Sequence, residues 1–512
     1  MSLETQNQTD TSECESLNPD QLVQFATGQR LKATSSICPV CREQVSAGVY
    51  ERNDEVWMDK QCSQHGRFSA LLSSASRHYY RSNPEKSGST ACCGNSCGVP
   101  NPAASAVAES GPWSNHSCTI LIEITERCNL SCPTCFAGST PAHSNMMDMQ
   151  EFTRQVDQLV DGGKRGSDMI QLSGGEPTIH PNFQEMVELL FDRGFEQVCI
   201  NSNGIKLAQP KFVKGLASCA EKYPRGEVYV YLQFDGFEDA TYSALRGRAD
   251  LLATKRKALK NCTDHGINVH PVMTLTRDIN DHEVGQFVQL AVDHPELKNV
   301  VIQPAMYSGR YDNPRRQDRI TLADTVNLIC TQFGIFSADD FMPIPCSDPN
   351  CFGMAVALRT RNGLLPVSRL FPRYDTWTTE DAQGLIQEFS DTINGPEAIS
   401  EAIRWATSNS RINEVLEQLD DDEVDGLLDA LVESQATGGS LWDQVLTISI
   451  KPFMDAWTYD QDRIDQCCVH ILDKQGNPVS FCEFNAINRP QMAEQDSRSA
   501  SKDLSAIRVI NA

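Results

Sequence analysis

The stretch that decides the fold runs TILIEITERCNLSCPTCF, from Thr119 to Phe136. Its first seven residues are β-branched and apolar, which predicts a buried strand. Cys128, Cys132 and Cys135 follow with the spacing C-x3-C-x2-C. Three thiolates in one short loop can hold three irons of a 4Fe-4S cube and leave the fourth iron open to a small molecule. The alternative is a zinc knuckle, but zinc prefers four closed ligands, usually in two separated pairs.

The composition places these cysteines in a reducing compartment. The chain has 512 residues with 20 cysteines, which fall in clusters, and a net charge of −24. An acidic surface repels phosphate, so we expect no nucleic-acid partner. The polar, acidic opening lacks signal-peptide blocks, and no apolar run reaches the ~18 residues of a transmembrane segment. We therefore expect a cytoplasmic protein, peripheral to a membrane at most, whose clustered cysteines bind metal.

Strand and helix patterns alternate along the chain from about residue 118 to about residue 340. Six β-then-α units predict an α/β fold with a parallel sheet, either a partial barrel or a doubly wound sheet. The domains we predict are a disordered tail (1–30), a Cys-rich N-terminal metal-binding domain (31–117), an α/β core (118–340), a C-terminal domain with an acidic helical segment at 380–450 (341–490), and a polar tail (491–512).

Short polar motifs stand where three further predicted strands end. They are SGGEP at 173–177, NSNG at 201–204 and QFDG at 233–236. Each alone is ordinary turn chemistry. In order, at successive strand ends, they mark the face on which parallel sheets carry their sites.

With an aromatic residue after its last cysteine, the triplet and these motifs resemble the radical S-adenosylmethionine (SAM) superfamily. The resemblance implies a partial (β/α)6 barrel, with a 4Fe-4S cluster on Cys128, Cys132 and Cys135. It also implies a 5′-deoxyadenosyl radical that abstracts hydrogen from an unactivated carbon, and an electron donor such as flavodoxin or ferredoxin. Glu176 would accept from the SAM amino group, within a cofactor-binding set of Gly174, Gly175, Glu176, Asn203 and Asp235.

A second metal site is predicted near the N-terminus. Cys38-Pro39-Val40-Cys41 is a knuckle that aims two sulfurs at one metal, and Cys62 with His65 could complete four ligands. A zinc-ribbon or rubredoxin-like centre fits, and spacing cannot separate zinc from a mononuclear iron. The alternative is that His65 is a surface residue and that the fourth ligand lies elsewhere.

Further cysteines flank the core in two groups. The first comprises Cys93, Cys97 and Cys118, and the second comprises Cys346, Cys351, Cys468 and Cys482. Cysteine-rich flanks around a radical SAM core imply auxiliary iron-sulfur clusters. The alternative is a set of loop thiols without metal.

The whole arrangement resembles the tetraether lipid synthase-like radical SAM proteins. The landmarks include the CPVC knuckle, the QCSQHG segment and the run from Ile450 to Asp455. One departure is that eighteen residues separate Cys97 from His116, where the family has a compact run. The resemblance implies C–C bond formation on lipid chains. The alternative is a methyltransferase acting on a pterin-like or other small molecule.

A third reading is a metal-binding scaffold without activity, which the presence of Glu176 and all three triplet cysteines disfavours. A lipid tail predicts an apolar tunnel beside the barrel mouth, whereas a pterin predicts convergent polar groups.

Overall fold

The computed structural model describes residues 28–79, 117–161, 169–311, 319–343, 347–360, 363–370, 425–426 and 444–494. The two tails beyond these residues, most of the acidic segment, and Cys93, Cys97 and Cys346 lie outside the described residues. Within the described part, none of the helices combines the length and the apolar character that crossing a membrane requires.

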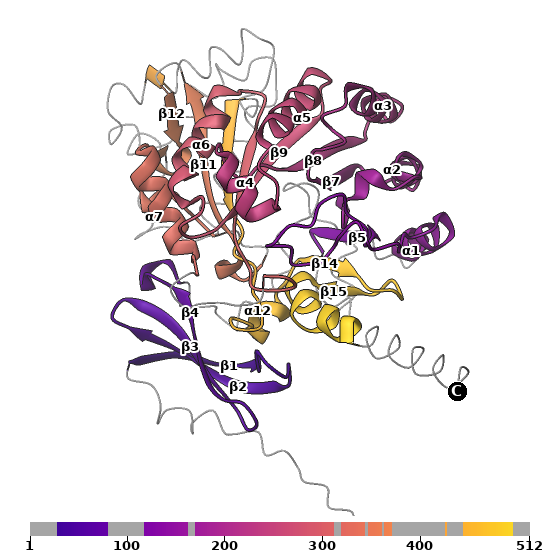
Figure 1. The fold of residues 1–512 in the computed structure, drawn as a ribbon. Helices are drawn as coiled ribbons and strands as arrows, with labels where there is room; N and C mark the ends of the chain where they lie inside the picture. The colour runs from indigo at the N-terminus through magenta and orange to yellow at the C-terminus, as the bar shows by residue number, and fades with distance from the viewer. Residues whose placement is uncertain are drawn as a thin grey trace, which may run out of the picture.

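The N-terminal domain is an antiparallel meander of four strands (Figure 1): β1 (Gln29–Ile37), β2 (Gln44–Arg52), β3 (Glu55–Cys62) and β4 (Gly66–Ser73). Asn53 and Asp54 connect β2 to β3 with φ values of 51° and 65°. Asparagine and aspartate tolerate this left-handed conformation, which matches the twist of a tight hairpin. A small core of Ala47, Val49, Val56 and Met58 fills the domain.

The core sheet contains six parallel strands in chain order: β5 (Thr119–Thr125), β6 (Met169–Gly174), β7 (Gln197–Ser202), β8 (Glu227–Gln233), β9 (Asn268–Leu275) and β10 (Asn299–Pro304). A doubly wound sheet would reverse its strand order at a switch point. The unbroken order therefore decides for the barrel type among the two predicted architectures.

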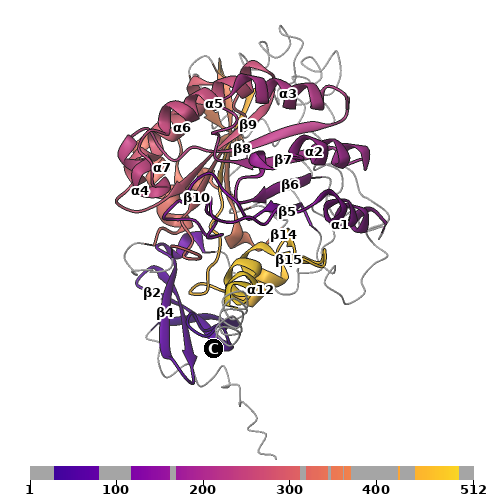
Figure 2. The ribbon, with the colours of Figure 1, turned by 45° about the vertical axis from the view of Figure 1, so that its right-hand side comes forward.

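Helices cover the convex face of this sheet (Figures 1 and 2). They are α1 (Met149–Asp161), α2 (Phe183–Asp192), α3 (Pro210–Ala220), α4 (Asp239–Arg246), α5 (Leu252–Asp264), α6 (Val284–Asp293) and α7 (Leu322–Phe333). The exception to this cover is α4, which packs its Tyr242 against Cys128 and Leu130 of the triplet loop. Alternate strand residues such as Ile120, Ile122 and Ile124 point to these helices and are fully buried in the main core. The other residues of each strand face the concave side.

The C-terminal segment extends both edges of the same sheet. At one edge β13 (Val445–Ile450) runs parallel to β10, followed by the antiparallel strands β11 (Gly353–Thr360) and β12 (Gly363–Pro366). At the other edge β14 (Val469–Leu472) runs parallel to β5 and pairs with β15 (Pro478–Ser480). These strands share one sheet with the core, across the boundary that the sequence analysis drew at residue 341.

Residues 451–468 cross from one edge to the other, and we call them the crossover. Its anchor is Asp455, whose side chain is fully buried. The Asp455 carboxylate accepts from the backbone N–H of Tyr307 at 3.1 Å and of Trp457 at 2.9 Å, and it forms an ion pair with Arg319 at 2.8 Å. The crossover is thereby fixed to the loop that follows β10.

The N-terminal domain docks on the crossover. Lys60 donates to the carbonyl of Ala456 at 2.7 Å, and Ser36 donates to the carbonyl of Tyr459 at 2.6 Å. The ring of Phe68 packs edge-on against Trp457, with centroids 5.6 Å apart. The metal-binding domain therefore contacts the segment that spans the mouth of the barrel.

Replacing Asp455 by alanine should destabilise the protein strongly, because the substitution leaves the Arg319 charge and several backbone donors without a partner. Removing one member of a buried pair costs about 3–5 kcal/mol of unfolding free energy. Thermal and denaturant unfolding of the metal-loaded protein measure the effect. The matched control is Asp250→Ala, which breaks a solvent-exposed pair with Arg248 and should change stability little. Equal effects of the two substitutions would contradict the anchoring role of Asp455.

Candidate active site and metal centres

Two glycines hold the cysteine triplet against the sheet. Gly175 donates its backbone N–H to the Thr125 carbonyl at 2.7 Å, and Glu176 donates to the Arg127 carbonyl at 3.0 Å. Gly174 has a φ of 120°, which other residues rarely adopt. A Cβ at Gly174 or Gly175 would overlap these same carbonyl groups. The two glycines therefore allow the end of β6 to approach the triplet loop itself.

The three triplet cysteines are free thiols in this structure, with Cys128 buried and Cys132 and Cys135 half-buried. They are not among the described groups whose ligand atoms lie within 4.8 Å of one another, as one shared ion would require. A cube fits this spacing because each thiolate binds a different iron. Burial, together with the Glu176 charge, raises the pKa of Cys128 to about 12. The thiolate there requires a metal to displace its proton.

Glu176 connects three segments around the triplet. Its carboxylate accepts from the Thr178 hydroxyl at 2.5 Å, the Ser202 hydroxyl at 2.9 Å and the Asn203 backbone N–H at 2.7 Å. Asn203 in turn donates to the side chain of Asn129, inside the triplet loop, at 2.6 Å. Burial raises the pKa of Glu176. Contact of Glu176 with the SAM amino group stays a prediction. In the structure its carboxylate joins the ends of β6 and β7.

Asp235 is held by a neighbouring arginine. Arg246 donates to both carboxylate oxygens of Asp235, at 2.5 and 2.6 Å, and both side chains are buried. Burial alone would raise the pKa of Asp235, but the Arg246 guanidinium lowers the pKa below its ordinary value. Burial raises the pKa of Cys132, and the nearby Arg246 charge opposes that rise. Asp235 therefore positions a cation beside one of the triplet sulfurs.

Arg310 clamps the loop that follows the triplet, and the sequence analysis missed it. Its guanidinium donates to the carbonyls of Cys132, Gly138 and Ser139 at 2.9, 2.6 and 2.9 Å. The adjacent Gly309 has a φ of 61° and leaves no room for a Cβ beside the Phe136 carbonyl. No sequence pattern marks Arg310, because its three acceptors are backbone groups some 170 residues away.

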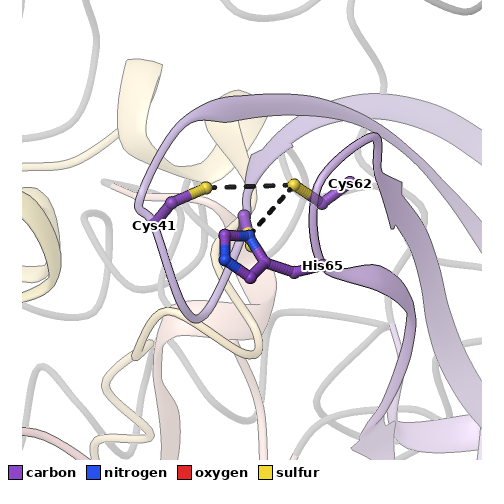
Figure 3. Close-up of side chains that lie close together, drawn as sticks. Cys41, Cys62 and His65 are labelled. Atoms are coloured by element: carbon purple, nitrogen blue, oxygen red, sulfur yellow. Dashed lines mark hydrogen bonds between the residues drawn. The ribbon is translucent and has the colours of Figure 1, made fainter.

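The N-terminal cysteines converge with His65 on one point. The ligand atoms of Cys38, Cys41, Cys62 and His65 all lie within 4.8 Å of one another. The Cys41 and Cys62 sulfurs lie 3.8 Å apart, and the Cys62 sulfur lies 3.5 Å from Nδ1 of His65. Figure 3 shows the three side chains pointing toward one another. A tetrahedral ion with bonds of ~2.3 Å separates its ligands by about 3.8 Å. The geometry therefore favours His65 as the fourth ligand, and its exposed ring places the site at the surface of the domain.

The electrostatics of this site also favour a metal. Burial opposes ionisation of Cys62, but hydrogen bonds from Gln64 and His65 lower its pKa to about 6. Burial raises the pKa of Cys41 at the same site, so the two sulfurs are shifted in opposite directions and the thiolate form that binds metal is favoured at Cys62.

The C-terminal cysteines divide into two places. Cys351, Cys467 and Cys482 act on one another electrostatically, and burial raises the pKa of Cys467 to about 11. Arg463 donates to the Cys351 sulfur at 3.4 Å. The Cys468 thiol is not part of this group. Its backbone carbonyl accepts the Cys118 N–H at 2.7 Å, where β14 meets β5. The structure thus brings together Cys351, Cys482 and Cys467, the last of which the sequence analysis did not select. Ligand roles for Cys118 and Cys468 stay predictions.

The concave face of the sheet is mostly polar. On β8 the outward residues Val228, Val230 and Leu232 are buried, whereas the inward residues Tyr229, Tyr231 and Gln233 are half-buried. On β6 and β7, Gln171 donates to Asn201 at 2.5 Å, and Asn201 donates to Ser173 at 3.2 Å. Inward side chains on β9 and β10 include His270, Thr274 and Gln303, which keep partial exposure, beside the buried Val272 and Val301.

Zinc binding can be tested by substitution of two ligands. We expect Cys41→Ser and His65→Ala each to lose ~1 zinc per chain, because a structural site needs all four ligands. The iron bound near Cys128 should be unchanged. Metal analysis of purified protein measures both. Cys262→Ala is the control, since Cys262 lies in the helical core of α5. Retention of zinc by His65→Ala would exclude His65 as a ligand.

The clamp by Arg310 makes a separate prediction about the cluster. Removing hydrogen bonds that hold metal ligands in place typically weakens metal binding about 10-fold or more. Arg310→Ala should therefore lose iron to a chelator about that much faster than the wild type. Arg310→Lys should be intermediate, because lysine cannot reproduce the forked geometry. Arg248→Ala, at the exposed Asp250 pair, is the control and should match the wild type.

Comparisons with known proteins agree with this geometry. Residues 122–291 match the family model of the Radical SAM superfamily, and residues 30–74 match that of the HMPTM N-terminal zinc ribbon domain. The chain is 28% identical over 507 residues to a 7,8-dihydro-6-hydroxymethylpterin dimethyltransferase of Methanocaldococcus jannaschii. The match covers 91% of this chain and 95% of that protein.

Two further similarities cover only part of the chain. A GTP 3′,8-cyclase of Desulforamulus reducens is 30% identical, over 34% of this chain and 52% of the cyclase, so the chain spans about half of that relative. The crystal structure of SuiB from Streptococcus suis aligns with a TM-score of 0.34 and 18% identity, over 42% of this chain and 45% of SuiB. With the triplet loop, the parallel sheet and the four-ligand ribbon, the family matches identify the chain as a radical SAM enzyme with an N-terminal zinc-ribbon domain.

Proposed function

We propose that this radical SAM enzyme is a methyltransferase that acts on a pterin-like heterocycle. The observation that carries the proposal is the polar concave face of the sheet. Amide, hydroxyl and imidazole groups of Gln171, Asn201, Tyr231, His270 and Gln303 line it. Small polar ligands are fixed by a few such convergent groups.

The same face is unfavourable for binding a long hydrocarbon chain. Covering the partly exposed side chains of Asn201, Tyr231 and Gln303 with lipid would remove their water without supplying hydrogen bonds, which is unfavourable. The C–C coupling of lipid chains that the sequence resemblance first implied therefore has less support than its alternative. The match to a pterin dimethyltransferase over 95% of that protein's length also supports the methyltransferase.

The residues present fit the cofactors that this family implies. Cys128, Cys132 and Cys135 would hold the SAM-binding cluster, and the loops at Gly174–Glu176 and at Asn203 would hold SAM. When bound, the reduced cluster and SAM supply a radical that removes hydrogen from a substrate carbon. Arg246 and Arg310 position the triplet loop for this task. We also infer an electron donor of the flavodoxin or ferredoxin type.

An auxiliary iron-sulfur centre fits the C-terminal cysteines. Cys351, Cys467 and Cys482 act on one another electrostatically, and Cys346, which lies outside the described residues, stands five positions before Cys351 in the sequence. The ring of Phe136, which follows the triplet, packs against Phe481 with centroids 5.7 Å apart. A centre on these cysteines would therefore lie close to the triplet loop, on the side of the crossover.

Hydrogen transfer from the substrate tests the proposal without knowledge of the methyl donor. Reconstituted enzyme is incubated anaerobically with SAM, reductant and deuterated 7,8-dihydro-6-hydroxymethylpterin. We expect deuterium in the 5′-deoxyadenosine that forms, measured by mass spectrometry. A parallel reaction with a deuterated isoprenoid-chain lipid should transfer none.

Controls separate inactive protein from a wrong substrate. Cys132→Ala should form no 5′-deoxyadenosine with any compound, because two thiolates cannot hold the cluster with its open iron. Deuterium transfer from the lipid and not from the pterin would overturn the proposal in favour of lipid coupling.

A further inference from the structure

The concave face carries one cation without an acidic partner. Lys451 directly follows β13, and its ammonium lies 5.6 Å from the centre of the Tyr231 ring and 5.4 Å from that of Phe352. Its nearest electrostatic neighbours are Tyr231, Cys468 and Cys199, and no described carboxylate forms an ion pair with it. Aromatic faces attract a cation, but by less than a full counter-charge would.

His270 stands beside this cation with an unused hydrogen-bonding atom. Its ring lies 5.4 Å from that of Tyr231 and 5.5 Å from that of Tyr229, centre to centre. Burial and the Lys451 charge lower the pKa of His270 to about 4, so the imidazole is neutral at pH 7. Nδ1 of His270 is buried and has no hydrogen-bond partner among the described residues. Buried polar atoms of this kind usually meet a ligand or water.

The strand register places these groups next to the predicted cofactor site. Tyr231 pairs with Asn201 on β7 and with His270 on β9. Ser202, the next residue of β7, hydrogen-bonds Glu176 at 2.9 Å. Tyr231 and His270 therefore lie one residue below the strand ends that carry the SGGEP and NSNG motifs.

We propose that Lys451, His270 and Tyr231 form a substrate-recognition subsite that binds an anionic group, a phosphate ester or a carboxylate, on a flat heterocyclic substrate. The inference rests on the proposed function, because it assumes that the heterocycle enters the concave face. A protonated amine, a neutral imidazole and a phenol offer an anion both charge and hydrogen bonds. The Tyr229, His270 and Tyr231 rings supply a surface on which a flat ring can pack.

The competing explanation is that Lys451 is structural and only packs between Tyr231 and Phe352. A structural lysine would cost stability when replaced and would not distinguish charged from neutral ligands. Lys451→Met keeps the length and the apolar stem but removes the charge, and Lys451→Arg keeps the charge. The two variants therefore separate recognition of an anion from packing.

Equilibrium binding to the metal-loaded enzyme tests the inference, with three probes: 6-hydroxymethylpterin, its phosphate ester, and inorganic pyrophosphate. We expect the wild type to bind the ester about 10-fold or more tightly than the neutral pterin, the size of one charge-assisted contact. Lys451→Met should lose this preference and still bind the neutral pterin within about 2-fold, whereas Lys451→Arg should keep most of the preference. The melting temperature of Lys451→Met should equal that of the wild type.

The other possible results of these binding measurements each contradict a specific part of the proposal. No preference for the ester in the wild type, or an unchanged preference in Lys451→Met, overturns the subsite while leaving the proposed function intact. A lowered melting temperature together with loss of all pterin binding in Lys451→Met overturns it in favour of the structural role. Pyrophosphate binding that depends on Lys451, without binding of either pterin, supports the anion subsite and overturns the pterin proposal instead.

Discussion

The structure depends on two backbone hydrogen bonds, from Gly175 and Glu176 to the carbonyls of Thr125 and Arg127. The loop that carries the three thiolates has no regular structure, so a neighbouring segment must fix its conformation. The end of β6 does so, and only glycine allows its backbone to come this close to the loop. Glu176 then connects the same point to β7, and Asn203 leads back to Asn129 in the loop. The GGE motif is thus a scaffold for the triplet as much as a candidate contact to SAM.

The crossover extends this scaffold to the rest of the molecule. Its Asp455 fixes it to the end of β10, its Ala456 and Tyr459 carbonyls receive the N-terminal domain, and Lys451 at its start reaches the concave face. Phe481, just beyond β15, packs on Phe136 beside the triplet. The zinc ribbon and the concave face therefore both contact the crossover, and the triplet loop contacts Phe481 beyond it. Loss of the ribbon metal would therefore disturb the position of the crossover through these contacts.

Local patterns predicted the local parts of this arrangement. Hydrophobic periodicity gave the six parallel strands, and turn chemistry gave the hairpin at Asn53 and Asp54. The sequence could not place β13 and β14 at opposite sheet edges, because pairing over more than a hundred residues leaves no local signal. Of the neighbouring Cys467 and Cys468, the member that does not lie beside Cys482 was selected as a ligand, for a related reason. Successive residues at a strand start point to opposite sides, and the register that separates Cys467 from Cys468 is set by β5.

The two faces of each strand explain how one sheet serves both stability and recognition. Outward residues such as Val230 bury their full surface under the helices, so the fold does not need the inward residues to be apolar. That freedom allows Tyr231, His270 and Lys451 to keep polar groups on the concave side without interrupting the hydrophobic core. An unmatched cation and an unsatisfied imidazole nitrogen are unfavourable in the free enzyme. A ligand that supplies the missing charge and hydrogen bond would convert this penalty into affinity and would be selected over a neutral analogue of the same shape.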